Sequence, residues 1–139
     1  ESSKYNKGIR GNTKIPIAYN MNIKGTTLIE GTLANCAGGK TPWGTILTCE
    51  ENFDNSYGDR KKDQKEVDTK NSYLHWEKYY PKNIPEHYGW VVEVDPLTGN
   101  AQKHMNIGRF SHECATCVQT KKGNVVVYSG DDHNDEHRD

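Results

Sequence analysis

The sequence contains few hydrophobic residues and no long hydrophobic run. Aliphatic, aromatic, Met and Cys residues make up 32% of its 139 positions, below the usual share of roughly 45–50%, which is counted on a slightly different residue set. No stretch approaches the ~18 consecutive apolar residues that a membrane-spanning helix needs. The sequence therefore predicts no membrane span, and a hydrophobic core that is either small or completed by other polypeptide.

The sequence also lacks an excess of charge of either sign. Its 18 basic and 19 acidic residues give a net charge of −1. Strong fields of one sign favour binding to nucleic acids or to charged membrane surfaces, so this balance gives no reason to expect either partner. The polar residues at the start show no signal-peptide pattern. The 4 cysteines are compatible either with disulfides in an oxidising compartment or with metal binding.

Short β-branched and aromatic segments, separated by turn residues, predict an all-β fold. The stretch at 54–86 differs, because it holds a mixed charge run and an aromatic segment at 73–80 that suits two helical turns. We expect it to be an irregular insertion. Residues 1–14 read as a solvated lead-in. The predicted strands are 15–19, 26–34, 43–49, 87–95, 101–105, 114–119 and 124–128.

The stretch 35–51 is the first candidate site. Gly38-Gly39 and Pro42 predict a turn that presents Cys36, and the strand after it would deliver Glu50 and Glu51 at its far end. A soft thiolate and two hard carboxylates are a reasonable start for a metal site. Because strand side chains alternate, only one of the two glutamates can face a given metal. Cys36 could equally be a packing residue or half of a disulfide.

Two further groups of polar residues follow. Arg109 carries a planar guanidinium that suits phosphate oxygens, with a surface or structural arginine as the alternative. Glu113, four positions later, can ligate a metal, as can Asp131 and Asp132 near the end of the chain. The Cys-x-x-Cys at 114–117 is a weak zinc signal, because zinc would need two more ligands.

Four blocks of this sequence resemble the PhoX-type alkaline phosphatases, in the order in which that family carries them. They read Asn-Cys-Ala-Gly-Gly-x-Thr-Pro-Trp-Gly-Thr-x-Leu-Thr-Cys-Glu-Glu at 35–51, His-Tyr-Gly-Trp-Val-Val-Glu-Val-Asp-Pro at 87–96, Gly-Arg-Phe-Ser-His-Glu at 108–113 and Val-Val-Tyr-Ser-Gly-Asp-Asp at 126–132. Together they span roughly a third of the chain. The resemblance implies a β-propeller, an exported protein and hydrolysis of small-molecule phosphomonoesters with iron and calcium ions.

The resemblance also implies roles for individual residues. Cys36 matches the family's iron-binding cysteine, and Arg109 is the expected catalytic residue that holds phosphate. The expected metal ligands are Cys36, Glu50, Glu51, Glu113, Asp131 and Asp132. Cys114 departs from the family, which usually has glycine after the glutamate, and the residues after Asp132 depart as well.

PhoX-type proteins are several times longer than this chain. We therefore expect residues 1–139 to be a single fragment of the propeller domain, made of one to two blades, whose exposed faces are covered by the rest of the parent chain or by self-association. An export signal would lie upstream. The alternative function is a non-catalytic propeller segment that serves binding or assembly.

Overall fold

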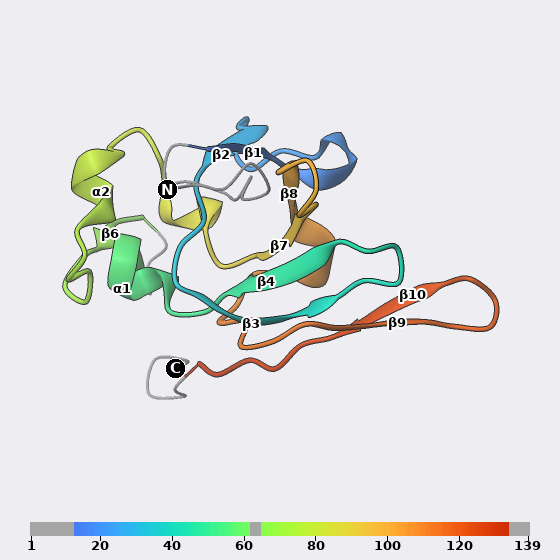
Figure 1. Ribbon diagram of the computed structural model, residues 1–139. Helices are drawn as coiled ribbons and strands as arrows, with labels where there is room; N and C mark the ends of the chain where they lie inside the picture. Colours follow the sequence, from blue (N-terminus) through green and yellow to red (C-terminus); the bar gives the residue numbers. More distant parts are fainter. Residues whose placement is uncertain (1–12, 62–64, 134–139) are drawn as a thin grey trace, which may run out of the picture.

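The computed structural model describes residues 13–61 and 65–133, and they form mostly short strands with few helices (Figure 1). The predicted all-β character is therefore confirmed, while most of the predicted lead-in lies outside the described residues. Within them, no helix is both long enough and apolar enough to cross a bilayer. The elements are β1 (Lys14–Pro16), η1 (Ala18–Asn20), β2 (Leu28–Glu30), β3 (Asn35–Lys40), β4 (Ile46–Glu50), α1 (Phe53–Tyr57), β5 (Asp59–Arg60), β6 (Val67–Asp68), α2 (Trp76–Tyr79), η2 (Pro85–His87), β7 (Val91–Val94), β8 (Ala101–His104), η3 (Met105–Ile107), β9 (Thr116–Gln119) and β10 (Val125–Tyr128).

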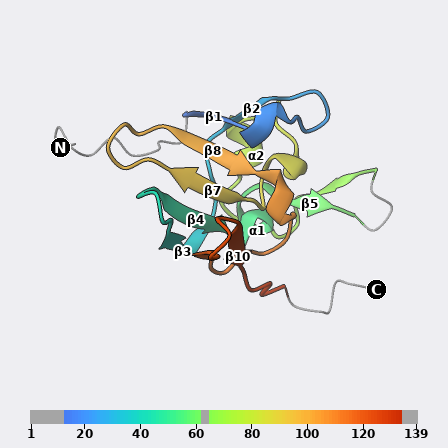
Figure 2. The same ribbon diagram turned by 90° about the vertical axis from the view of Figure 1, so that its right-hand side faces the viewer.

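A four-stranded antiparallel sheet with the order β3-β4-β7-β8 forms the centre of the molecule (Figures 1 and 2). The strands predicted at 87–95 and 101–105 are confirmed as β7 and β8, which form a hairpin with Val92 opposite Lys103. The strands predicted at 114–119 and 124–128 form a second hairpin, β9–β10, which is a separate two-stranded sheet. The β1–β2 pair lies beside β8, where Ile17 forms a bridge to Lys103.

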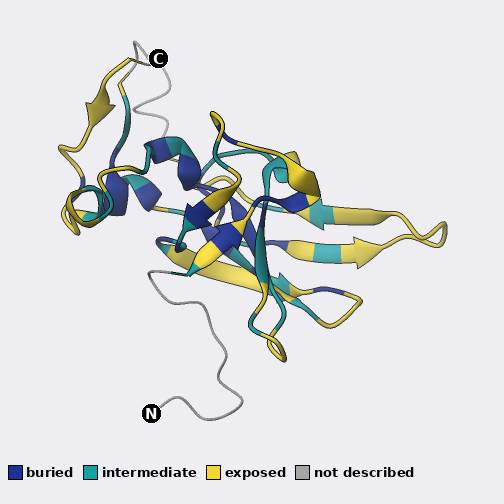
Figure 3. Cartoon of the chain, turned by 90° about the horizontal axis from the view of Figure 1, so that it is seen from above, coloured by how far each residue is buried: buried dark blue, intermediate teal, exposed yellow. Residues whose placement is uncertain are grey.

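The hydrophobic core has two parts. The larger cluster joins the β1–β2 region to α1 and to the start of β7, and the smaller cluster lies between the central sheet and β9–β10. Buried residues concentrate there, whereas most of the β9–β10 hairpin is exposed (Figure 3). The larger cluster is Ile17, Ile23, Ile29, Leu33, Phe53, Tyr57, Tyr88 and Trp90; the smaller is Leu47, Cys49, Val91 and Ala115.

The turn predicted around Cys36 is wrong, because residues Asn35–Lys40 form the edge strand β3. Its two glycines permit unusually close strand contacts. A Cβ at Gly38 would lie 1.7 Å from the carbonyl oxygen of Leu47, and one at Gly39 would lie 2.2 Å from that of Ala115. These glycines therefore mark close backbone approach rather than a turn. The chain reverses later, where the Thr41 amide donates to the Thr45 carbonyl at 2.9 Å.

Several other predicted elements are shorter than expected. The strand predicted at 15–19 ends at Pro16 and gives way to η1, and the strand predicted at 26–34 is limited to Leu28–Glu30. The predicted irregularity of 54–86 is confirmed for the residues that the structure describes, 54–61 and 65–86, which hold only short helices and two-residue strands. The helix predicted at 73–80 covers only Trp76–Tyr79, and the rings of Trp76 and Tyr80 stack with their centres 4.7 Å apart.

Candidate functional site

The β3–β4 hairpin brings Cys36 and Glu51 together. Asn35 lies opposite Glu50, and Cys36 lies opposite Cys49. One residue further, the amide of Glu51 donates to the carbonyl of Ala34 at 3.1 Å. The thiol of Cys36 hydrogen-bonds to the Glu51 carboxylate. The two ends of the predicted metal-binding stretch are therefore neighbours, because the chain folds back between them.

Glu113 reaches the same place from a distant part of the chain. The segment before it docks on the end of β4, where the amide of His112 donates to the carbonyl of Glu50 at 3.1 Å. Glu113 itself is held by a hydrogen bond from its amide to the carbonyl of Gly130 at 3.2 Å. Its side chain is exposed, and its charge acts on the Cys36 thiol.

The negative charges of Glu51 and Glu113 both act on the Cys36 thiol. A backbone hydrogen bond from Ala37 acts to lower the pKa of the Cys36 thiol, but the hydrogen bond to Glu51 and the negative charges of Glu51 and Glu113 raise that pKa above its ordinary value. The carboxylates of Glu51 and Glu113 thus both oppose ionisation of the exposed Cys36 thiol. Nevertheless, no group of three or more His, Cys, Asp or Glu side chains within residues 13–61 and 65–133 is arranged to hold a metal ion.

Glu50 has a different environment, although it is adjacent to Glu51. Its side chain is fully buried, and both of its carboxylate oxygens accept hydrogen bonds. The backbone amides of Leu33, Gly89 and Trp90 donate at 2.9, 2.9 and 3.0 Å. Lys103 Nζ donates to Glu50 Oε1 at 2.7 Å. The carboxylate is therefore fully used in joining β4 to the start of β7 and to β8.

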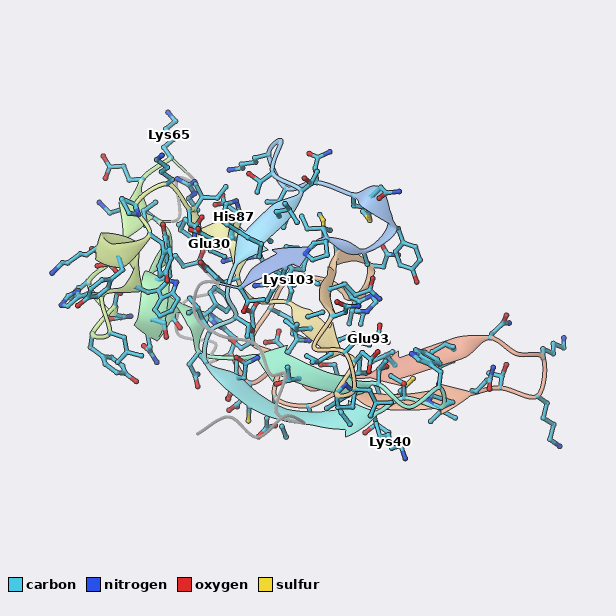
Figure 4. The ribbon with its side chains drawn as sticks, turned by 45° about the horizontal axis from the view of Figure 1, so that its top comes forward. Glu30, Lys40, Lys65, His87, Glu93 and Lys103 are labelled. Atoms are coloured by element: carbon cyan, nitrogen blue, oxygen red, sulfur yellow. The ribbon has the colours of Figure 1, made fainter. Side chains whose placement is uncertain are left out.

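Lys103 is the partner that the sequence analysis missed. It is completely buried, it also donates to the carbonyl of His87 at 3.0 Å, and its ammonium lies 4.7 Å from the centre of the Tyr88 ring (Figure 4). Burial lowers the pKa of Lys103, while the Glu50 charge acts to raise it. The available signal was a lysine within the strand predicted at 101–105, because an ammonium that is buried in a sheet requires an acidic partner.

Arg109 is held by the protein itself. Its Nε donates to the carbonyl of Tyr88 at 2.7 Å, and its Nη2 donates to Asp59 Oδ1 at 3.0 Å and to the carbonyl of Pro85 at 3.1 Å. The guanidinium also lies over the Phe53 ring at 4.4 Å. These contacts engage two of the three guanidinium nitrogens. The predicted contact with phosphate stays a prediction, and the observed partners favour a bracing role.

The Gly-Asp-Asp segment runs beside the segment that contains Glu113. Asp131 forms an isolated bridge with His112, and the Asp132 amide donates to the carbonyl of Ser111 at 3.1 Å. Both aspartates are exposed. His112 is buried, with Nε2 at 2.9 Å from the carbonyl of Gly108 and Nδ1 at 2.8 Å from the Ser129 hydroxyl. A carbonyl only accepts, so Nε2 carries the hydrogen and the ring is a structural link.

Comparisons with known proteins identify the family of this chain. The sequence model of the family described as "Alkaline phosphatase PhoX" matches residues 1–138. The chain belongs to the PhoX family. A solved structure, Pseudomonas fluorescens PhoX in complex with vanadate, a transition state analogue, matches with a TM-score of 0.74 and 35% identity over 94% of this chain. The match spans 27% of the Pseudomonas chain. No curated protein matches the sequence.

The four PhoX-like blocks, far apart in the sequence, form one continuous structural unit. The strands of the first and second blocks pair as β4 and β7. The third block docks on the first through His112 and Glu50, and the fourth docks on the third through Gly130 and Glu113. The four blocks therefore lie in one continuous region, where Cys36 and Glu113 are exposed and Glu51 is partly exposed.

Proposed function

We propose that this chain is part of a PhoX-type alkaline phosphatase that hydrolyses phosphomonoesters, and that Cys36, Glu51 and Glu113 are ligands of its metal centre. The observation that carries the proposal is the meeting of one thiol and two carboxylates in a chain of the PhoX family. The two carboxylates come from segments about sixty positions apart in the sequence, so their approach to the thiol is a property of the fold rather than of local sequence.

The chemistry of these donors fits metal ions. Each carboxylate makes it harder for the thiol to ionise, and a cation would reverse that effect because it favours the thiolate. Thiolate suits iron, whereas carboxylate oxygens suit calcium as well. Asp131 and Asp132, which are exposed beside the Glu113 segment, would add oxygen ligands. Metals held there would supply Lewis-acid polarisation of the phosphoryl oxygens.

The protein residues around this centre have separate roles. Glu50 holds β4, β7 and β8 together and thereby fixes the position of Glu51. Arg109 ties its own segment to Tyr88 and Pro85, so that Glu113 reaches the centre from a rigid support. In this proposal Arg109 is a positioning residue, and a direct contact between Arg109 and phosphate is the alternative that the variant described in the Discussion tests.

The wider architecture follows from the same proposal. A four-stranded antiparallel sheet is the unit from which propeller blades are built. In a complete propeller, further polypeptide would cover exposed apolar residues of the β9–β10 hairpin, among them Val118, Val125 and Tyr128. The parent protein would be exported, in keeping with its family.

The experiment that tests the proposal is metal analysis of a Cys36→Ser variant of the full-length protein. We expect bound iron to be lost and most calcium to be kept, because iron accepts a thiolate ligand and calcium does not. The matched control is Cys117→Ser, which removes a thiol from β9 and should leave both metals bound. Equal iron content in the Cys36→Ser variant and the parent would refute the ligand role.

A further inference from the structure

His87 is a buried histidine whose ring has no part in the candidate metal centre. It ends η2 and is 3% exposed. The backbone amide of Ile84 donates to its Nδ1 at 3.4 Å. A backbone N–H only donates, so Nδ1 accepts and Nε2 carries the hydrogen of the neutral ring. That Nε2–H group is buried without a hydrogen-bond partner among residues 13–61 and 65–133. The fold thus provides no acceptor for this ring's proton.

The ammonium of Lys103 approaches η2 from β8 (Figure 4). It donates to the carbonyl of His87 at 3.0 Å and pairs with Glu50. Burial is the largest influence on the His87 ring; the Lys103 charge also opposes its protonation, whereas the charge of Glu86 favours it. Together they lower the pKa of His87 to about 4. In an unfolded chain the same ring titrates near its ordinary value of about 6.5.

Basic groups outnumber acidic ones around η2. The groups that contact it directly or through a partner are Lys24, Arg60, Lys103 and Arg109 on one side and Glu50, Asp59 and Glu86 on the other. Burial acts to raise the pKa of Glu86, but hydrogen bonds from Arg60 and Lys24 lower it to about 2. Glu86 therefore stays ionised in mild acid. A proton on His87 would add positive charge where cations already exceed carboxylates.

We propose that His87 is an acid-sensitive latch: η2 stays packed against β8 while the ring is neutral, and uptake of one proton favours a locally open state in which the ring reaches water. A protonated ring has two N–H donors, so the Ile84 amide would lose its acceptor and Nε2–H would stay unpaired. Burial of a charged group without partners is strongly unfavourable. Water supplies acceptors for both N–H groups only when η2 leaves β8.

Opening of η2 would reach the end of β4. Lys103 links the carbonyl of His87 to the carboxylate of Glu50. Glu50 also accepts a hydrogen bond from the amide of Gly89, two positions after His87. Departure of η2 would therefore loosen the bonds that hold Glu50. The latch itself does not depend on the phosphatase proposal, whereas its effect on the position of Glu51 rests on that proposal.

The direction of the pH dependence follows from proton linkage. Between about pH 6.5 and about pH 4 the ring is neutral when buried and protonated when exposed. The open state then binds more protons than the closed state. Acidification across this interval should therefore favour opening, by up to about tenfold per pH unit for a single group. The stabilisation is fully present above about pH 6.5 and is lost as the pH falls toward 4.

The test is hydrogen–deuterium exchange of the full-length protein between about pH 7 and about pH 4.5, read by mass spectrometry on the peptide that covers residues 84–90. The amides of His87 and Tyr88 each donate at 3.0 Å to a carbonyl of the η2 turn, so they report its opening. After correction for the intrinsic exchange rate at each pH, we expect their protection to fall below about pH 6.5, by up to about tenfold per pH unit. Constant protection would overturn the proposal.

Two variants identify the ring. His87→Gln carries no titrating group, so protection of the η2 peptide should not change over this pH interval. Its matched control is His75→Gln, at an exposed histidine before α2, which should keep the fall seen in the parent. If His87→Gln fails to fold, His87→Leu takes its place. Burial also lowers the pKa of His112, and a fall caused by that ring would persist in the His87 variants and overturn the proposal.

Discussion

Glu50 and Glu51 are adjacent in the sequence, and the structure uses them in opposite ways. Glu50 is buried, accepts hydrogen bonds from three backbone amides and pairs with Lys103. Glu51 is partly exposed beside the thiol of Cys36 and the charge of Glu113. The first carboxylate has every partner it needs inside the fold, whereas the second lies beside a neutral thiol and a further negative charge. The comparison separates a carboxylate that serves the fold from the one that we propose as a metal ligand.

The largest expected effect comes from neutralising each glutamate in turn. Glu50→Gln should lower the free energy of unfolding by about 3–5 kcal/mol, because it leaves the Lys103 ammonium buried without its counter-ion. Glu51→Gln should change that free energy by no more than about 0.5 kcal/mol, since its surroundings are open to solvent. Urea denaturation of both variants in metal-free buffer measures the difference. Similar losses in the two variants would contradict the assigned division of roles.

A second variant tests whether Arg109, like Glu50, is held by partners within the fold. Arg109→Lys keeps the charge and loses the planar fork, so the bonds to Tyr88, Pro85 and Asp59 cannot all be kept. We expect the free energy of unfolding to fall by about 1–3 kcal/mol, with an unchanged KM for a phosphomonoester in the full-length protein. A raised KM with unchanged stability would instead show that Arg109 holds phosphate directly, as the sequence predicts.

The smallest expected effect is a shift in the pKa of the Cys36 thiol. With metals removed by a chelator, the alkylation rate of Cys36 should rise with pH through a midpoint above that of an ordinary thiol, because Glu51 and Glu113 raise its pKa. Glu51→Gln should shift this midpoint downward, since one hydrogen-bonding carboxylate charge is removed and the thiolate forms more easily. Iodoacetamide labelling, followed by mass spectrometry of the Cys36 peptide, measures the rate. An upward shift, or none, would show that Glu51 does not act on the thiol.

Much of the strand pattern could be predicted locally. The alternating segment around Val91–Val94, its return strand at Ala101–His104 and the hairpin that ends with Val125–Tyr128 occur where β-branched residues and turn signals place them. The prediction failed at Gly38-Gly39, because glycine marks both turns and close strand approach. Only the positions of the Leu47 and Ala115 carbonyls distinguish the two cases, and those carbonyls belong to other segments of the chain.

The sequence by itself determined which donors exist, in what order they occur and that two adjacent glutamates at a strand end cannot both face the same side while the backbone is extended, because alternation is a local property of extended backbone. Only the tertiary structure decided which of the two is buried. That outcome depends on Lys103, which is 53 positions away from Glu50, and on the docking of the Glu113 segment beside Cys36. The residues next to the glutamates predict neither contact, because burial and charge balance are set by groups that approach from distant parts of the chain.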